Sequence, residues 1–235
     1  MNLTVLLQVI AETAPVAIEE SVETQISLWD LALKGGWLMI PLALMLLLAI
    51  YIFVERLIVL HKASKEDASF MNRIKDYIYD GKIESAMNLC KETHTPSARM
   101  IEKGISRLGR PMSDVLVAIE NVGNIEIAKL EKGFTMMATI AGGAPMVGFL
   151  GTVIGMVEAF YQMSTKGDNT INLSDLSGGI YTAMVTTVAG LIVGVCAYFA
   201  YNFLVARLDK IMRKLESKNM EFLDLLNEPA AGKNK

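Results

Sequence analysis

Charge is missing from three long stretches of this 235-residue sequence. No Asp, Glu, Lys or Arg occurs in residues 35–54, 133–157 or 176–206. About 20 helical residues cross the hydrocarbon core of a bilayer, whereas a helix of a soluble protein rarely extends so far without charge on its solvated face. We therefore expect an all-α membrane protein with three transmembrane helices over these ranges and with long helical extensions on the cytoplasmic side.

Cysteine, histidine and excess charge of one sign are also scarce. The two cysteines, Cys90 and Cys196, and the two histidines, His61 and His94, have the spacing of neither a disulfide framework nor a metal site. A formal net charge of -3 gives no indication of nucleic-acid binding. The P-loop, the Gly-x-Ser-x-Gly motif and the His-Glu-x-x-His motif do not occur in the sequence. We expect no cofactor, no metal, no nucleic-acid partner and no enzymatic activity.

Lysine and arginine are unevenly distributed among the segments that flank the predicted spans. Residues 1–34 and 158–175 hold one each, whereas residues 55–132 hold 13 and residues 207–235 hold seven. Because segments rich in Lys and Arg stay on the cytoplasmic side, the sequence predicts an outer N-terminal segment, an outer hairpin, a cytoplasmic helical domain and a cytoplasmic C-terminal helix with a tail. For residues 1–10, a cleaved signal peptide and an amphipathic segment on the outer leaflet both remain open, and we favour the second.

The cytoplasmic segments carry apolar residues at helical spacing. Turn signals at Asp80-Gly81, Thr95-Pro96 and Gly109-Arg110-Pro111 predict a series of short helices. No proline follows Pro111 until Pro145, so residues 112–132 are predicted to join the second span as one long rod. Beyond the third span, five residues at three- and four-residue steps predict an extension that packs in a bundle: Leu208, Ile211, Leu215, Phe222 and Leu225.

Small residues are concentrated in the second and third predicted spans. Glycine stripes let membrane helices approach closely, so that van der Waals packing replaces the missing hydrophobic drive. We also expect Pro145 to bend the second span, because it removes one helical hydrogen bond. The predicted packing residues are Gly143, Pro145, Gly148, Gly151, Gly155, Gly179, Gly190 and Gly194.

Threonines are clustered in the same two spans. Thr182, Thr186 and Thr187 lie within six residues, and Thr152 lies on the neighbouring span. Each hydroxyl can simply bond to a carbonyl of its own helix, but the cluster favours the interpretation that all four line a polar pathway between several subunits. The spans contain no ionisable carboxylate or amine, so any proton that crosses needs a titrating group from another chain.

Two motifs carry a resemblance to a known family. Residues 144–153 read Ala-Pro-Met-Val-Gly-Phe-Leu-Gly-Thr-Val, and residues 179–191 read Gly-Ile-Tyr-Thr-Ala-Met-Val-Thr-Thr-Val-Ala-Gly-Leu. They are similar to the Ala-Pro-x-x-Gly-Leu-x-Gly-Thr-Val and Gly-Ile-x-Glu-Ala-x-x-x-Thr-x-x-Gly-Leu patterns of the ExbB/TolQ/MotA proton-channel family. The acidic outer extension before the first span makes the chain most similar to the ExbB branch.

The resemblance implies a multi-pass protein of the bacterial inner membrane with its N-terminus in the periplasm and its C-terminus in the cytoplasm. It implies a pentamer around a pore, an ExbD-like partner whose single membrane helix carries an aspartate into that pore, and a TonB-like energy transducer. Thr152 and Thr187 match the family's pore-facing threonines. The implied function is that of a stator and proton-channel subunit, which uses the proton motive force to energise TonB-dependent outer-membrane transport.

One position departs from the family pattern. Thr182 stands where the family often has glutamate, and a hydroxyl does not carry a proton as a carboxylate does. We therefore expect the partner's aspartate to be the proton carrier, because Glu158 at the outer end of the second span is not an obvious replacement. Three alternatives remain open: a TolQ-like subunit that energises envelope integrity, a channel or transporter that acts alone, and a membrane scaffold whose cytoplasmic helices bind a soluble partner.

Overall fold

The computed structural model describes residues 35–65, 69–165 and 173–227. Within these ranges the chain is helical and has no strand. The helices are α3 (Met39–Ser64), α4 (Phe70–Tyr79), α5 (Ile83–Glu92), α6 (Pro96–Ile105), α7 (Met112–Glu131), α8 (Phe134–Thr165) and α9 (Leu173–Asn227). The segment expected before the first span, the tail after residue 227 and the centre of the outer hairpin lie outside the described residues.

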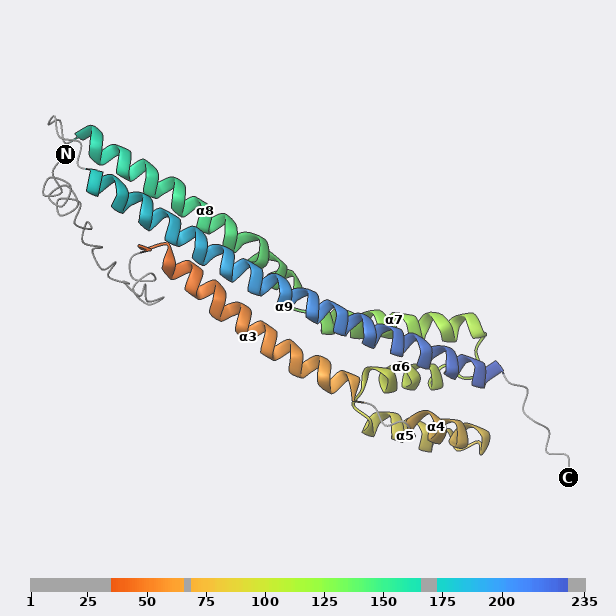
Figure 1. Cartoon of the computed structure of the whole chain (residues 1–235). Helices are drawn as coiled ribbons and strands as arrows, with labels where there is room; N and C mark the ends of the chain where they lie inside the picture. The colour runs from red at the N-terminus through yellow and green to blue at the C-terminus, as the bar shows by residue number, and fades with distance from the viewer. Residues whose placement is uncertain (1–34, 66–68, 166–172, 228–235) are drawn as a thin grey trace, which may run out of the picture.

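The molecule is an elongated bundle in which α9 spans nearly the whole length (Figure 1). At one end α9 lies beside α3 and α8, and at the other end it lies among α4 to α7. Among the described residues, three helical stretches are long and apolar enough to cross a membrane: α3, the stretch formed by α7 and α8, and α9. The predicted fold class, an all-α membrane protein with three spans and long helical extensions, is therefore confirmed.

The turn signals of the sequence fall between the short helices. Gly81 and Gly109 adopt φ angles of 74° and 86°, which side chains other than glycine rarely adopt, so each ends a helical segment. At the start of α6, the Thr95 hydroxyl accepts a hydrogen bond from the backbone N–H of Ala98, and Pro96 occupies the first helical turn. The predicted breaks are confirmed at all three places.

The prediction of one unbroken rod from residue 112 is wrong at a single point. Helix α7 ends at Glu131 and α8 begins at Phe134, because Gly133 adopts a φ angle of 89°. A left-handed residue cannot continue a right-handed helix. Pro145, by contrast, lies inside α8, and the helix continues on both sides of it.

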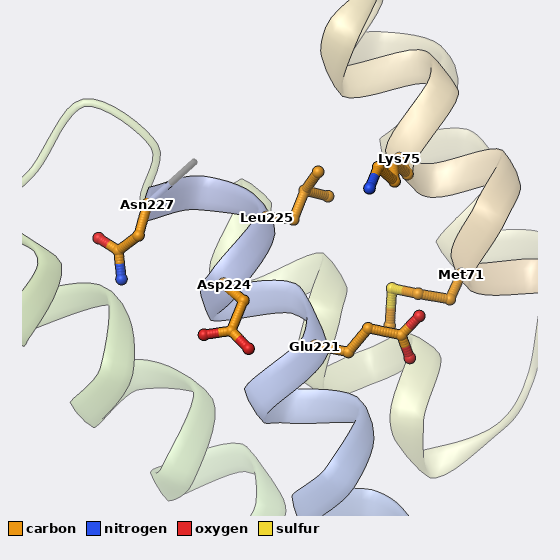
Figure 2. Close-up of a pocket in the computed structure, with 6 residues that line it drawn as sticks. All are labelled: Met71, Lys75, Glu221, Asp224, Leu225 and Asn227. Atoms are coloured by element: carbon orange, nitrogen blue, oxygen red, sulfur yellow. The ribbon is translucent and has the colours of Figure 1, made fainter. Parts of the chain in front are cut away.

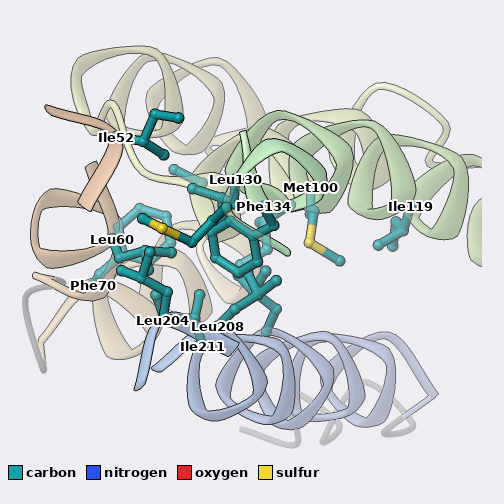
Figure 3. Packing of buried hydrophobic residues seen from close by; sticks show 14 of the residues in the cluster. Ile52, Leu60, Phe70, Met100, Ile119, Leu130, Phe134, Leu204, Leu208 and Ile211 are labelled. Carbon is teal, nitrogen blue, oxygen red and sulfur yellow. The ribbon is translucent and has the colours of Figure 1, made fainter. Parts of the chain in front are cut away.

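Buried apolar side chains hold the helical domain against the last part of α9. Figure 3 shows Phe134 and Leu130 near Leu204, Leu208 and Ile211 of α9. All five residues that were expected to pack beyond the third span are buried, and Phe222 is fully enclosed beside Gly104 of α6. Because α9 belongs both to the membrane bundle and to this core, it fixes the helical domain relative to the spans.

Candidate functional site: the contact between α8 and α9

Helices α8 and α9 approach each other so closely that glycine is required at several positions. A Cβ atom at Gly190 would lie 2.6 Å from the carbonyl oxygen of Ala144 and 2.8 Å from the Cα atom of Gly148. A Cβ atom at Gly148 would lie 2.9 Å from the carbonyl oxygen of Thr186. These distances are below ordinary van der Waals contact and involve backbone atoms, so the two helices touch backbone to backbone.

The same contact continues toward both ends of the pair. On one side of Gly190, a Cβ atom at Gly194 would lie 2.5 Å from the ring of Pro145. On the other side, a Cβ atom at Gly155 would lie 2.8 Å from the Cβ atom of Ala183, and one at Gly179 would lie 2.8 Å from the Cβ atom of Ala159. The order of these pairs shows that α8 and α9 run antiparallel, with small residues alternating along one seam.

Gly143 differs from the packing prediction. A Cβ atom at Gly143 would meet nothing within 4 Å, as is also the case for its neighbour Gly142. Residues four apart on a helix do not lie exactly above one another, so the line from Gly143 to Gly151 and Gly155 winds slowly around α8. Only Gly151 and Gly155, toward the outer end of this line, face α9. Gly143 therefore lies outside the contact within one chain.

The four threonines differ in burial and in their hydrogen-bond partners. Thr186 is 2% exposed, donates a hydrogen bond to the carbonyl oxygen of Ala183 at 2.7 Å and lies against Gly151. It is thus part of the contact between the helices and differs from the predicted lining. Thr152 is half-buried and donates to the carbonyl oxygen of Phe149 at 2.6 Å. Thr182 is half-buried near the start of α9.

Thr187 is the threonine that joins the two helices. Its hydroxyl donates a hydrogen bond of 2.9 Å to the carbonyl oxygen of Gly148 on α8. Gly148 lies one helical turn before Thr152, so the hydroxyls of Thr152 and Thr187 belong to the same level of the bundle. The half-buried state of both residues places them at the rim of the contact and not at its centre.

Large apolar side chains cover much of the outer surface of α3, α8 and α9. Among the most exposed are Trp37, Ile40, Leu44, Met146, Phe149, Phe160, Tyr161, Met184 and Phe199. A monomeric protein in water rarely exposes such a surface, which suits a bilayer or neighbouring subunits. The polar groups of Thr152, Thr182 and Thr187 thus lie within a surface that is otherwise apolar.

A groove of about 510 Å³ opens at the opposite end of α9, far from the threonines. Figure 2 shows Lys75 and Met71 of α4 on one side and Glu221 and Asp224 of α9 on the other. Its charged groups are on the extramembrane part of the chain, so it is separate from the α8–α9 contact. Among the described residues, no group of three or more His, Cys, Asp or Glu side chains could hold a metal ion.

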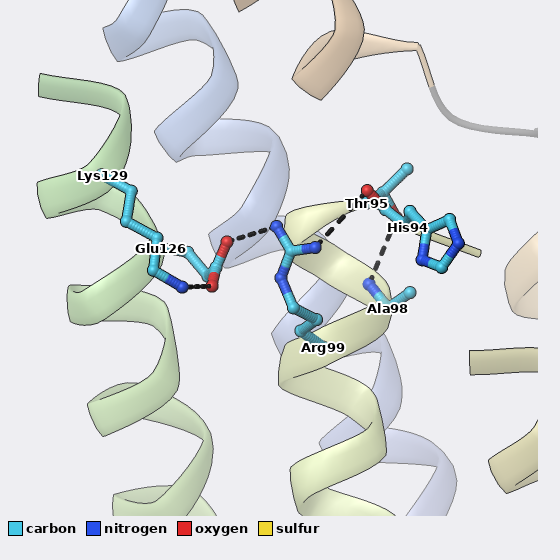
Figure 4. Close-up of polar contacts among 6 residues, drawn as sticks. All are labelled: His94, Thr95, Ala98, Arg99, Glu126 and Lys129. Atoms are coloured by element: carbon cyan, nitrogen blue, oxygen red, sulfur yellow. Dashed lines mark hydrogen bonds and ion pairs between the residues drawn. The ribbon is translucent and has the colours of Figure 1, made fainter. Parts of the chain in front are cut away.

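A buried carboxylate that the sequence analysis did not single out lies on α7. Glu126 is 3% exposed; it accepts a hydrogen bond from Lys129 at 2.7 Å and a second, very short one from Arg99 of α6 (Figure 4). Burial alone would raise the pKa of Glu126, but the hydrogen bonds and positive charges of Arg99 and Lys129 outweigh it and hold the pKa below the usual range. Glu126 is therefore ionised in neutral solution.

This ionic cluster reaches Glu55 and Arg56 in the second half of α3. The carbonyl oxygen of Lys129 accepts a hydrogen bond of 3.3 Å from Arg56, whose guanidinium also pairs with Glu55 at 2.6 Å. The cluster consequently connects α3, α6 and α7 just before the break at Gly133. The signal that identifies Glu126 is its place in the apolar stripe of α7, formed by Val115, Ile119, Gly123 and Leu130.

The seam of small residues, the threonines at its rim and the apolar outer surface define a membrane-embedded helical subunit built for close packing. Residues 92–217, more than half of the chain, match the model of the MotA/TolQ/ExbB proton channel family. The chain belongs to this family, and its three apolar stretches make it a multi-pass protein of the inner membrane.

Curated relatives carry both ExbB and TolQ names. The chain is 27% identical over 225 residues to the Tol-Pal system protein TolQ of Haemophilus influenzae, covering 89% of this chain and 97% of that protein. It is 28% identical over 178 residues to the biopolymer transport protein ExbB of Neisseria meningitidis, covering 68% and 79%. A putative biopolymer transport protein, ExbB-like 3 of Synechocystis, is 26% identical over 170 residues, covering 72% and 81%.

Proposed function

We propose that this protein is the multi-span stator subunit of a proton-driven motor complex of the ExbB type. Five copies surround a pore that receives the membrane helix of an ExbD-like partner, and a TonB-like transducer passes the work to outer-membrane transporters. The chain supplies an apolar sleeve, and Thr152, Thr182 and Thr187 supply hydroxyls on its inner surface. The N-terminus lies in the periplasm and the basic helical domain lies in the cytoplasm, in keeping with the distribution of Lys and Arg.

The observation that carries the proposal is that the charge-free stretches of α8 and α9, residues 133–157 and 176–206, pack together and carry hydroxyls at the rim of their contact. A carboxylate that crosses such a surface is costly when charged and much less costly when protonated. Each proton that moves down the membrane potential supplies about 2.3 kcal/mol per 100 mV. Alternating protonation of the partner's aspartate thus changes its preferred position, and the fixed hydroxyls of Thr152 and Thr187 solvate it at one level.

In this proposal Thr182 contributes a hydrogen-bonding hydroxyl and does not carry the proton. A threonine in place of the frequent family glutamate can donate and accept a hydrogen bond, but it does not take up a proton at physiological pH. The partner's aspartate is then the carrier. Glu158 is exposed near the outer end of α8, where it contributes negative charge at the mouth of the pathway.

Hydroxyl removal tests the proposed pathway. The double variant Thr152→Val plus Thr187→Val keeps side-chain shape and removes both hydroxyls, whereas Thr152→Ser plus Thr187→Ser keeps the hydroxyls and serves as the matched control. With the partner co-expressed, we expect the valine variant to lose proton flux and energised uptake while the oligomer still assembles. We expect the serine variant to retain most of both. Normal uptake in the valine variant would refute the pathway.

The partner requirement is tested by reconstitution. A channel that acts alone would conduct protons in vesicles that contain only this chain, whereas the proposal expects flux only when the ExbD-like partner is present. A scaffold that binds a soluble partner would conduct protons in neither preparation, and it would also tolerate the loss of both hydroxyls. The three hypotheses therefore give different results in one pair of flux measurements, with and without the partner.

A TolQ-like role is the second candidate, because the match to the Haemophilus influenzae TolQ covers nearly the whole of both chains. In that case the work serves envelope integrity and not TonB-dependent uptake. Expression in strains that lack either ExbB or TolQ distinguishes the two roles: restored uptake of a TonB-dependent substrate supports the first, and restored resistance to detergent supports the second.

A further inference from the structure

A pocket of about 430 Å³ lies between α3 and α9, immediately beyond the ends of their charge-free stretches. Its basic lining comes from both helices, with His61 and Lys62 on α3 and with Arg207 and Lys210 on α9. Leu57, Ile58 and Ile211 contribute an apolar wall. We call this site the junction pocket. It is separate from the α8–α9 contact, and the proton pathway proposed above makes no use of it.

The junction pocket lies at the depth of lipid head groups. Arg207 directly follows the last residue of the third charge-free stretch, and Lys210 lies about 5 Å further along the helix. On α3, His61 lies about 10 Å beyond Val54, the last residue of the first charge-free stretch. The rings of Phe53 and Phe203 contact each other with centroids 6.1 Å apart, which sets the two helices at the same level. The head-group layer extends about 5 to 8 Å beyond the hydrocarbon core on each side, so the pocket opens within or next to it.

An aromatic ring holds the arginine of the pocket, and the two lysines of the pocket, Lys62 and Lys210, are exposed. The guanidinium of Arg207 lies 5.2 Å from the ring centroid of Phe203, a cation–π contact that leaves its N–H groups able to donate. Lys214, one turn beyond Lys210, donates to the carbonyl oxygen of Ser64 at 3.3 Å and ties α9 to the end of α3. Within the part of the chain that the structure describes, no ion pair joins Lys62, Arg207 or Lys210 to an acidic residue.

We propose that the junction pocket binds the head group of an anionic phospholipid. The phosphate accepts hydrogen bonds from Arg207, Lys210 and Lys62, and the first methylenes of the acyl chains lie along Leu57 and Ile58. The apolar wall and the depth favour a phospholipid over free phosphate, because basic pockets between membrane helices at this level face a dense layer of lipid phosphates. The bound lipid fastens α3, the helix with few contacts to α8, to the base of α9.

Lipid titration tests this proposal. The full chain is purified in detergent, stripped of lipid and titrated with phosphatidylglycerol or phosphatidylcholine of the same acyl chains, and bound lipid is counted by native mass spectrometry. We expect tighter binding of phosphatidylglycerol. The variant Arg207→Gln plus Lys210→Gln should weaken it about fivefold per removed charge, or roughly 25-fold in total. The matched control Lys103→Gln plus Arg107→Gln removes two charges from α6 and the turn that follows it, and it should leave binding unchanged.

Several outcomes would overturn the proposal. They are equal binding of the two lipids, an unchanged affinity in the Arg207 and Lys210 variant, and displacement of the lipid by inorganic phosphate at a similar concentration. If the variant dissociates into single chains while lipid binding persists, the pocket is a contact between copies of the chain. Circular dichroism and elution volume establish that the variant is folded. Should it not fold, the single variant Lys62→Gln at the exposed end of α3 is expected to weaken phosphatidylglycerol binding about fivefold on its own.

Discussion

Adding one methyl group at Gly190 is expected to separate α8 from α9. The new Cβ atom would lie 2.6 Å from the carbonyl oxygen of Ala144, whereas ordinary contact begins near 3.4 Å, so the helices must move apart by about 0.8 Å. Overpacking of this kind costs about 1–3 kcal/mol, and here both sides are backbone, which has no rotamer to change. The movement also stretches the 2.9 Å hydrogen bond from Thr187 to Gly148, which adds about 0.6 kcal/mol.

The expected loss of stability for Gly190→Ala is therefore about 2–4 kcal/mol. The matched control is Gly142→Ala on α8, where the added Cβ atom meets nothing within 4 Å and alanine is the better helix former. Unfolding of both variants in detergent, followed by circular dichroism against temperature and against added sodium dodecyl sulfate, measures the difference. If Gly190→Ala unfolds together with Gly142→Ala and the unmodified chain, the backbone contact described here does not stabilise the pair.

Two further predictions concern the helical domain. Glu126→Gln leaves the shape of the side chain unchanged but removes the charge that pairs with Arg99 and Lys129, so we expect a loss of about 1–3 kcal/mol at neutral pH. Because the pKa of Glu126 is lower in the folded state, its contribution is fully present above the usual glutamate pKa of about 4.3 and is lost as the pH falls through the folded-state value. Stability curves of the two proteins should thus converge in acid, and a constant difference down to pH 3 would contradict the lowered pKa. Burial, and to a smaller extent the charge of Glu102, raises the pKa of Cys90 to about 12. In a Cys196→Ser background, Cys90 should therefore resist maleimide in the folded protein at pH 7.5 and react after denaturation, and rapid labelling of the folded chain would show that the thiol is accessible.

The positions of the helices along the chain could be predicted largely from the sequence, whereas most contacts between the helices could not. Charge-free windows, turn glycines and the cap at Thr95 are local signals, so the spans and the short helices were predictable. The break at Gly133 was not, because a single glycine at the start of an apolar run carries no mark of a positive φ angle, and the α3 residues that lie near it, Ile52 and Arg56, are distant in sequence. Glu126 was also missed, since a lone glutamate on a helix gives no sign of its partners and Arg99 is 27 residues away.

The threonines show that a stripe of residues identifies one face of a helix but does not tell whether that face packs against another helix or lines a pathway. Thr182, Thr186, Gly190 and Gly194 lie on one i, i+4 line, and the glycines of that line belong to the face of α9 that contacts α8. Thr186, in the middle of this line, is enclosed by the neighbouring helix, whereas Thr182, at its outer end, stays half-buried. Thr187, one residue round, reaches the rim and bonds to α8 while remaining half-buried. In a tightly packed membrane bundle, hydroxyls that line a polar pathway are accordingly expected one residue beside the small-residue stripe. The closely packed part of the stripe itself is covered by the neighbouring helix.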